Sequence, residues 1–315
     1  MPLFGAHMSI AGGLYKAVEA AAAHGMDTVQ IFTHSPSQWV AKPVVSAEIA
    51  SLRVGKSLTK NNNQSNATDL GADEIQRFHA TLKSTKLKFP TAHDSYLINL
   101  ASPDATLYRR SIDAFVIEVE RAESLGLAYL VMHPGTPTDG DDAAGLIRIS
   151  KALDEIHERC PDLQVKVLLE TTAGQGKSLG WQFEHLAAIL DTVKESKRLG
   201  VCLDTCHVFA AGYRLAPEAE YEKTMTSFQH LIGLKRLKVF HMNDSKKALG
   251  SRVDRHEQIG QGHLGLEPFR LLVNDPRFAK TPMILETPKE GPKGEDMDMD
   301  IVNLHTLRSL VGKKR

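Results

Sequence analysis

The sequence has little cysteine, no long apolar run and no net charge, and each shortage excludes a class of protein. Its three cysteines, Cys160, Cys202 and Cys206, form no C-x-x-C pair and are too few for a disulfide framework. No apolar stretch approaches the roughly 20 residues of a membrane helix, and the start lacks the pattern of a signal peptide. The 38 basic and 38 acidic residues balance, which excludes a uniformly basic, nucleic-acid-coating protein. We therefore expect a cytoplasmic protein that does not bind membranes.

Hydrophobic residues make up 42% of the 315 residues, enough for a large core. Short β-type runs alternate with longer amphipathic segments along the whole chain, which favours βα units on a parallel sheet. The predicted helices are Gly13–His24, Ala105–Leu125, Asp141–Glu158 and Phe183–Val193. The predicted strands are Leu3–His7, Thr28–Thr33, Lys88–His93, Tyr129–His133, Lys166–Glu170, Gly200–Asp204, Leu237–His241 and Pro282–Glu286.

Eight βα units in one chain predict an α/β fold, a closed (β/α)8 TIM barrel that forms a single domain over residues 1–315. An open, doubly wound sheet is the alternative. The step from the second predicted strand to the third is longer than the others. Residues 54–71, which are polar and rich in asparagine, account for the excess. We predict that this segment is a flexible insertion within the second crossover.

The ends of the predicted strands carry residues that can bind metals. Seven of the eight strands end on histidine, glutamate or aspartate, and the carboxyl ends of barrel strands open on one face. Burying so many ionisable groups is costly unless something pairs with them, and a cluster of divalent cations would do so. These strand-end residues are His7, His93, His133, Glu170, Asp204, His241 and Glu286.

Two short motifs add further donors to the same face. His207 follows Asp204 by three residues, about one helical turn, and Asp254 and His256 lie in the long loop after the seventh strand. Sites that mix imidazole with carboxylate suit Zn²⁺, with Mn²⁺ or Fe²⁺ next, whereas Mg²⁺ and Ca²⁺ prefer oxygen. Open sites with several metals typically hold a phosphoryl group, so the hydrolysis of a phosphate ester is the leading prediction.

Eight stretches carry a resemblance to a known family. They are GAHMS (5–9), HDSYLINL (93–100), HPG (133–135), ETTAGQG (170–176), DTCH (204–207), HMNDS (241–245), GSRVDRH (250–256) and LET (285–287). With these motifs, the chain resembles the endonuclease IV family of zinc-dependent apurinic/apyrimidinic endonucleases (deoxyribonuclease IV). The resemblance implies a hydrolase that acts in DNA repair. It would cut double-stranded DNA on the 5′ side of an abasic site and leave a 3′-hydroxyl.

The resemblance also implies three zinc ions, for which Mn²⁺ is a possible substitute. Two zinc ions would share a hydroxide that attacks phosphorus, and the third would neutralise the leaving oxygen. Glu170 would bridge two ions, and Glu286 would orient or deprotonate the nucleophile. His7, which is left over, would lie behind a ligand and orient it. The implied ligand sets are His93, His133 and Glu170; Glu170, Asp204, His241 and Glu286; and His207, Asp254 and His256.

For DNA contact, the resemblance points to loops at the barrel mouth that fill the gap left by an extruded sugar. Tyr96 and Leu97 directly follow His93 and match this role; the alternative is an ordinary pair of core residues. In family members an arginine precedes Gln-Trp after the second strand, but here Ser37 precedes Gln38. Because a hydroxyl cannot stack on bases as a guanidinium can, we expect Tyr96, Leu97 and Gln38 to carry more of the insertion.

Two other functions are open at this point. Sugar isomerases and epimerases similar to xylose isomerase have the same barrel with metal ligands at strand ends, but generally hold only one or two ions. The donors His207, Asp254 and His256 favour the endonuclease, since a third site has no task in moving a proton or hydride on a sugar. The last alternative is a non-enzymatic module that binds metal or DNA. We expect a monomer.

Overall fold

The protein was analysed as a computed structural model, which describes residues 2–39, 70–291 and 297–312. Eight parallel strands form one sheet in the order β1-β10-β7-β6-β5-β4-β3-β2. The edge strands β1 and β2 meet through a parallel bridge between His7 and Gln30. The strands are β1 (Leu3–Ala6), β2 (Gln30–Phe32), β3 (Thr91–His93), β4 (Tyr129–Met132), β5 (Lys166–Glu170), β6 (Leu199–Asp204), β7 (Leu237–His241) and β10 (Pro282–Leu285).

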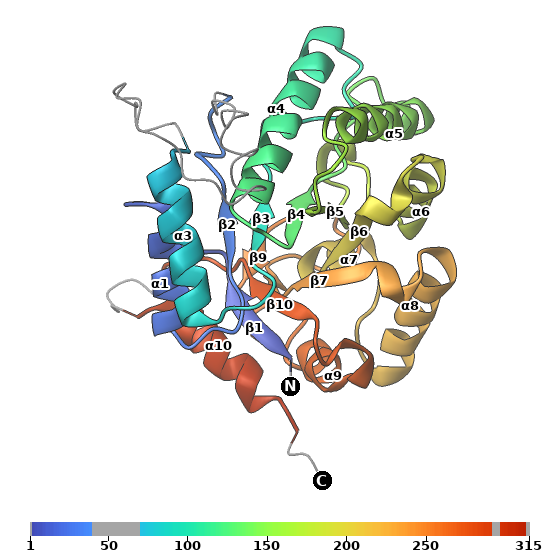
Figure 1. Ribbon diagram of the computed structural model, residues 1–315. Coiled ribbons are helices and arrows are strands. Elements are labelled where there is room, and N and C mark those ends of the chain that lie inside the picture. The colour runs from blue at the N-terminus through green and yellow to red at the C-terminus, as the bar shows by residue number, and fades with distance from the viewer. Residues whose placement is uncertain (1, 40–69, 292–296, 313–315) are drawn as a thin grey trace.

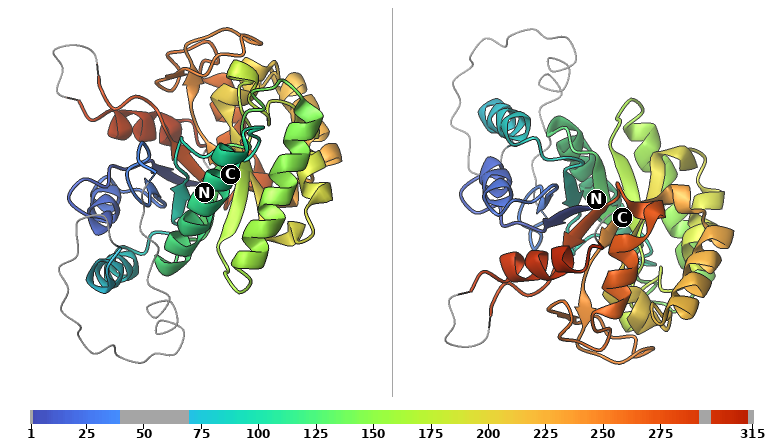
Figure 2. Two further views of the ribbon diagram at one scale, coloured as in Figure 1. Left: turned by 90° about the horizontal axis from the view of Figure 1, so that it is seen from above. Right: turned by 90° about the horizontal axis from the view of Figure 1, so that it is seen from below.

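Helices surround the strands on the outside, as Figure 1 shows from one end of the barrel and Figure 2 from two sides. A two-stranded antiparallel hairpin, β8 (Asp244–Ser245) and β9 (His256–Glu257), lies after β7. The helices are α1 (Leu14–Ala23), α3 (Ala72–Thr85), α4 (Ala105–Ser124), α5 (Asp142–Arg159), α6 (Phe183–Thr192), α7 (Thr205–Ala211), α8 (Glu218–Leu231), α9 (Glu267–Asn274) and α10 (Met299–Ser309).

Burial on both faces explains why the strands are nearly continuous apolar runs. In β6 all residues from Leu199 to Asp204 are buried. The helices pack an apolar stripe against the strands, and several begin at an aspartate. Asp104, for example, accepts a hydrogen bond from the backbone N of Leu107 (2.7 Å) at the start of α4. Such a cap satisfies one of the free N–H groups at a helix start.

The predicted (β/α)8 TIM barrel is confirmed, and each of the eight predicted strands matches a strand of the sheet. Four predicted strand ends, His7, Thr33, His133 and Glu286, lie one residue beyond the last residue of their strands. No helix of the described residues is long and apolar enough to cross a bilayer.

Most of the predicted insertion, residues 54–69, lies outside the described residues. Its last two residues are described. Leu70 is buried in the core and Gly71 directly precedes α3. Leu70 therefore contributes to the packing of the barrel, and the proposal of an insertion concerns the residues before it.

Candidate metal centre

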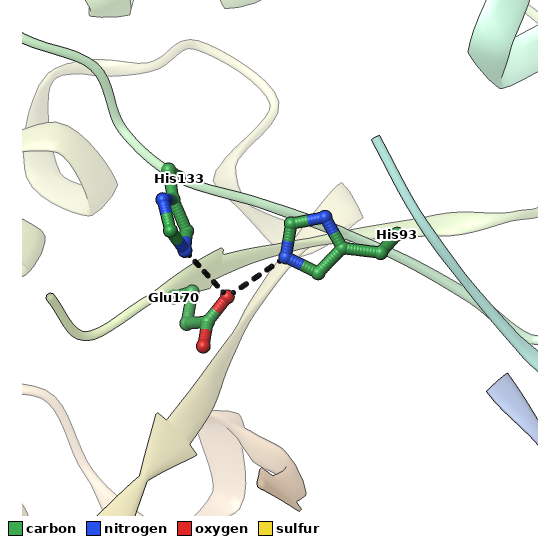
Figure 3. Close-up of side chains that lie close together, drawn as sticks. All are labelled: His93, His133 and Glu170. Carbon is green, nitrogen blue, oxygen red and sulfur yellow. Dashed lines mark hydrogen bonds and ion pairs between the residues drawn. The ribbon is translucent and has the colours of Figure 1, made fainter. Parts of the chain in front are cut away.

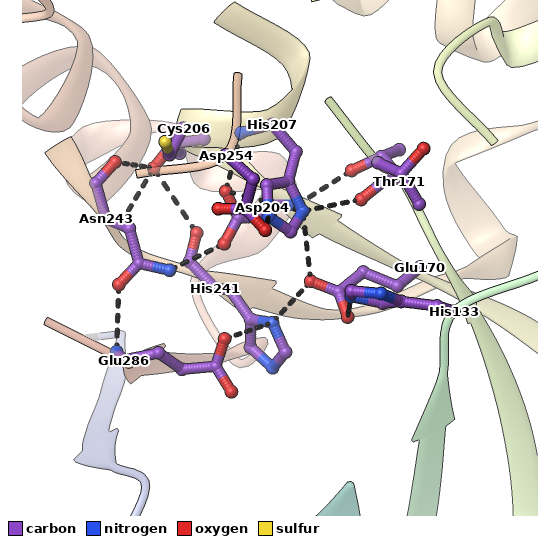
Figure 4. A network of polar contacts seen from close by, with 12 residues as sticks. His133, Glu170, Thr171, Asp204, Cys206, His207, His241, Asn243, Asp254 and Glu286 are labelled. Carbon is purple, nitrogen blue, oxygen red and sulfur yellow. Dashed lines mark hydrogen bonds and ion pairs between the residues drawn. The ribbon is translucent and has the colours of Figure 1, made fainter. Parts of the chain in front are cut away.

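Glu170, at the carboxyl end of β5, lies at the centre of a cluster of imidazoles and is fully buried. Its Oε2 is 3.0 Å from His93 Nε2 and 3.2 Å from His133 Nε2 (Figure 3). Its Oε1 is 2.8 Å from His241 Nδ1 and 3.4 Å from His207 Nδ1 (Figure 4). Burial alone would raise the pKa of Glu170, but the charges of His241 and His133 outweigh it, so this pKa lies well below its ordinary value. Glu170 is therefore ionised.

Two further carboxylates lie near Glu170, one at the end of β6 and one directly after β10. Glu286 Oε2 is 3.1 Å from His241 Nδ1. Asp204 ends β6 and begins α7, where its Oδ1 accepts from the backbone N of His207 (2.7 Å). Its Oδ2 accepts from Asn243 Nδ2 at 2.5 Å (Figure 4). This cap explains why His207, one turn later, faces the same centre as Asp204.

A third group lies nearer to solvent and rests on the loop after β8. Asp254 Oδ2 is 3.1 Å from His207 Nε2, and Asp254 Oδ1 is 3.2 Å from His256 Nε2. Burial would lower the pKa of His256, but Asp204 and Asp254 raise it to about 9. The side chain of Asp254 is 36% exposed, whereas that of His207 is only 2% exposed.

The donor atoms of these residues fall into compact sets whose members all lie within 4.8 Å of one another. Two other sets of the same compactness include a cysteine, Cys202 or Cys206. Burial raises the pKa of Cys206 to about 12 and that of Cys202 well above its ordinary value, so neither thiol favours the thiolate that binds metal. The sets made of nitrogen and oxygen donors alone are His93, His133 and Glu170; Glu170, Asp204, His241 and Glu286; and His207, Asp254 and His256.

Charge makes this cluster a place for cations. The pKa values of His93 and His207 lie well above the ordinary value although burial lowers them, because carboxylates hydrogen-bond and attract both rings. A cluster of carboxylates that holds protons so tightly favours any cation with matching donors. Nitrogen and oxygen donors at this spacing suit a divalent metal ion. The residues present therefore fit metal ions.

Backbone carbonyls orient three of the imidazoles. In each ring one nitrogen faces a carboxylate of the cluster and the other, Nδ1, lies within hydrogen-bond distance of a main-chain oxygen. An Nδ1–H that donates to a carbonyl leaves the lone pair of Nε2 for a metal. The pairs are His93 with Asp94 O (3.1 Å), His207 with Thr171 O (2.8 Å) and His256 with Glu286 O (3.1 Å).

An open cavity of about 380 Å³ lies above the cluster. At roughly 30 Å³ for each water molecule, it has room for a group the size of a sugar with its phosphate. The lining residues come from the ends of several strands and from the loop after β8. They are His7, Phe32, His93, Tyr96, His133, His207, Asp254, Arg255, His256, Glu286 and Lys289.

Comparisons with known proteins identify the family. A family model described as "Xylose isomerase-like TIM barrel" matches residues 18–302. The chain is 47% identical over 311 residues to a protein of Chloroflexus aggregans named "Probable endonuclease 4", and the match covers 99% of this chain and 98% of the relative. The chain belongs to the endonuclease 4 family. The crystal structure of endonuclease IV from Thermus thermophilus superposes with a TM-score of 0.78 at 32% identity and covers 98% of both chains.

The barrel also resembles proteins outside the endonuclease 4 family. The crystal structure of a D-tagatose 3-epimerase-like protein superposes with a TM-score of 0.68 over 98% of this chain. Its sequence identity is only 19%, so this likeness shows the fold alone.

In this endonuclease 4 chain, the residues assigned to DNA contact lie on two loops beside the cavity. Tyr96 is 70% exposed and stands edge-on to Phe32, with ring centroids 5.3 Å apart, so it is not a core residue. Leu97 is half-buried, and Ser37 and Gln38 are exposed.

Hydrogen bonds connect the two loops to each other and to the loop after β4, which begins at His133. Ser95 Oγ donates to Pro36 O (2.7 Å) and so joins the loop after β3 to that after β2. Asn99 Nδ2 donates to Thr136 O, and Thr136 N donates to Asn99 Oδ1, both at 2.9 Å. Gly135 has a φ of 119°, and a Cβ there would come within 2.6 Å of Asn99 Oδ1. Glycine at 135 is therefore required for this contact.

Sequence reasoning missed two amides that hold the cluster together. Gln30 is fully buried and lies beside His7, Glu286 and His241, and Asn243 Oδ1 accepts from the backbone N of Glu286 (2.8 Å). Gln30 stands in an apolar strand between Val29 and Ile31. A polar residue within an apolar strand is the sequence feature that could have drawn attention to Gln30.

Proposed function

We propose that this chain is a DNA-repair endonuclease that hydrolyses the phosphodiester on the 5′ side of an abasic site, leaves a 3′-hydroxyl, and uses three Zn²⁺ ions. As a member of the endonuclease 4 family, the chain is a phosphodiester hydrolase. The observation that carries the proposal is the grouping of nine donor residues into three compact sets beneath one open cavity. Several adjacent cation sites suit a transferring phosphate, because they can neutralise its charged oxygens.

The three sets correspond to three ions. His93 and His133 would hold the first with Glu170, and Asp204, His241 and Glu286 would hold the second with the same Glu170. The third ion would lie on His207, Asp254 and His256. Zn²⁺ suits these mixtures of imidazole and carboxylate, and Mn²⁺ is the substitute we expect to be accepted. When bound, such ions act as Lewis acids and bring the pKa of a water molecule towards about 7.

The residues of the chain would divide the work around those ions. Glu170 presents one oxygen to each of two imidazole pairs, so it would bridge two ions and fix their spacing. Glu286 lines the cavity while its Oε2 faces His241, which supports a role in orienting the attacking water. His7 lies 3.5 Å from the other oxygen of Glu286 and would hold that carboxylate from behind.

DNA recognition would come from the exposed residues of the loops beside the cavity. Tyr96 and Leu97 would enter the duplex where the sugar leaves it, and Gln38 would assist from the loop after β2. Ser37 is too short to fill a gap the size of a base. A sugar without a base leaves the helix at lower cost than a paired nucleotide, which favours an abasic site as the target.

As part of this proposal, we expect the protein to be a monomer in the cytoplasm. The isomerase alternative is not proposed, because its structural support is a fold likeness at 19% identity. The third set, with Asp254, also has no task in moving a proton on a sugar.

Metal analysis combined with strand cleavage tests the proposal. Purified protein should contain three zinc ions per chain and nick a duplex with one abasic site, but not the same duplex with an intact nucleotide. Asp254→Ala should contain two ions and nick slowly. His230→Ala, which removes an exposed histidine of α8, is the matched control and should keep three. Fewer than two ions in the unaltered chain, together with no nicking, would reject the proposal.

A further inference from the structure

Gln30 lies where the end of β1 meets β2. It pairs with His7 in the bridge between the two strands, and its backbone oxygen accepts from Met8 N at 2.8 Å. Its side chain is fully buried and points among the residues of the proposed second zinc site. Gln30 Nε2 is 2.5 Å from Glu286 Oε1 and 3.0 Å from His7 Nδ1, and Gln30 Oε1 is 2.8 Å from His241 Nε2.

The partners of the Gln30 amide decide which way it faces. A carboxylate that binds a cation is ionised and can only accept hydrogen bonds, so the NH₂ group of Gln30 must face Glu286. The amide oxygen therefore faces His241 Nε2. Since an amide oxygen can only accept, His241 Nε2 must carry the proton. The lone pair of His241 then lies on Nδ1, the nitrogen 2.8 Å from Glu170 and 3.1 Å from Glu286.

We propose that Gln30 is a positioning residue that fixes the tautomer of His241 for metal binding and at the same time holds the Glu286 carboxylate. This inference rests on the proposed function, because it assumes a metal ion between His241, Glu170 and Glu286. Gln30 contacts two ligands of the same ion with opposite ends of one amide. Its hydrogen bonds thus set the angle between those ligands as well as the protonation of one of them.

Among the proposed ligand imidazoles that have such a partner in the described residues, His241 differs because a side-chain amide, and not a main-chain carbonyl, faces its outer nitrogen. His93, His207 and His256 have main-chain carbonyls in that role, which no substitution of the partner residue removes. The Nε2 of His241 faces Gln30, so the tautomer of His241 can be tested by mutation while His93, His207 and His256 keep their main-chain partners.

Three variants separate the two tasks of the amide. Gln30→Met keeps the volume and removes the hydrogen bonds of the amide to His241 and Glu286, together with its contact to His7. Gln30→Glu keeps an acceptor for His241 Nε2 but removes the donor to Glu286 and adds a repelling charge. The matched control is Asn303→Leu, which removes another buried amide whose partners are Gln258, Thr287 and Met299 rather than the proposed ligands.

The first measurement is the rate at which zinc-loaded protein gives up zinc to a chromogenic chelator, followed without DNA. Gln30→Met should release one zinc about 10- to 100-fold faster than the unaltered chain. Loss of a residue that hydrogen-bonds to a metal ligand typically lowers metal affinity by that factor. Gln30→Glu should also release zinc faster. Asn303→Leu should lower the melting temperature and leave the release rate unchanged.

The second measurement is two-bond ¹H–¹⁵N correlation of histidine-labelled, zinc-loaded protein, with the His241 signal assigned by its loss in His241→Asn. Unaltered protein and Gln30→Glu should show His241 protonated on Nε2, and Gln30→Met should show a mixed or exchange-broadened signal. An unchanged signal and unchanged zinc release in Gln30→Met, in a parent chain that binds zinc and nicks abasic DNA, would overturn the inference alone. A parent chain that binds no zinc would overturn it together with the proposed function.

Discussion

Charged side chains have different partners at the two ends of the barrel. At the carboxyl ends of the strands, ionisable side chains contact one another, as Glu170 contacts four imidazoles. At the amino ends, charged side chains contact the backbone. Arg198 Nη2 donates to Cys160 O (2.6 Å), and Arg236 Nη1 donates to Leu199 O (3.3 Å) and Ser196 O.

This difference separates chemistry from stability within one fold. A charge that is paired with main-chain carbonyls stabilises the connection it spans and has no free capacity for a ligand. A cluster of charges that satisfy one another only in part is costly to the fold and strongly attracts cations. Four predictions test this contrast, beginning with the largest expected effect.

Replacing the central carboxylate should remove catalysis and spare the fold. We expect Glu170→Gln to slow the nicking of abasic DNA on the order of a thousandfold or more, because an amide lacks the charge to bridge two cations. The far-UV circular dichroism should be unchanged. Single-turnover nicking measures the rate, and metal analysis should show that zinc is lost.

Glu123→Gln is the counterpart at the amino end, where the carboxylate accepts from the backbone N of Gln164 (2.7 Å) and of Val165 (2.8 Å). This variant should nick at the parent rate. Near-normal nicking by Glu170→Gln would end its bridging role, and an unfolded Glu170→Gln would make its role structural.

Removing an arginine at the amino end should affect stability alone. Arg236→Ala should lower the free energy of unfolding by about 2 kcal/mol, since hydrogen bonds to a charged group contribute about 1.5 to 3 kcal/mol. Urea unfolding measures this loss. The single-turnover rate of the folded, zinc-loaded variant should equal that of the parent, and a tenfold slower rate would show that the two ends are not separate.

Acid should destabilise the amino end through His157, whose ring nitrogens find no partner among the described residues. Burial, with the nearby charge of Arg198, lowers the pKa of His157 to about 4. The folded state therefore keeps the ring neutral while the unfolded state takes up a proton below about pH 6.5. The free energy of unfolding is therefore unaffected by this group above pH 6.5. It falls as the pH drops from 6.5 towards 4, by at most about 2 to 3 kcal/mol.

His157→Leu should remove that loss. The check is the difference in unfolding free energy between His157→Leu and the parent chain, measured at pH 7.5 and again at pH 4.5 in metal-free buffer. The difference should shift in favour of the variant at the lower pH. A constant difference would mean that His157 titrates normally.

The smallest effect is expected at the exposed loops of the carboxyl end, outside the buried cluster. Ser37→Arg should tighten binding to abasic duplex several-fold, because a guanidinium can stack on bases and a hydroxyl cannot. The single-turnover rate should change little. Leu97→Ala should weaken binding, and unchanged affinity in both variants would show that these loops do not fill the gap in the duplex.

The metal-binding end could be predicted from the sequence because each donor follows an apolar strand or a short motif. His93, Glu170 and His241 stand at the last position of their strands, and the parallel arrangement then brings them together. The local sequence pattern is therefore enough to place these residues in the cluster. Asp204 caps the short helix α7 and thereby brings His207 to the same cluster.

The amino-end contacts and Gln30 could not be predicted in this way. Arg198 and Arg236 stand in polar, Lys- and Arg-rich stretches that suggest a solvated surface, and their partners arrive from neighbouring connections some 37 to 41 residues away. Gln30 contacts residues from three other strands, including Glu286 at the far end of the chain. Such contacts exist only once the barrel has closed. The local pattern can therefore mark Gln30 as a polar residue in an apolar strand, but it cannot identify the partners of Gln30.

Asn99 gives the DNA-facing side of the barrel a mechanical property. Its paired hydrogen bonds to Thr136 connect the loop that bears Tyr96 to the loop that begins at His133. A force applied to Tyr96 by a bent duplex would reach the loop that begins at His133 through these two hydrogen bonds. Binding of a kinked substrate and the position of the His133 side chain would then be coupled.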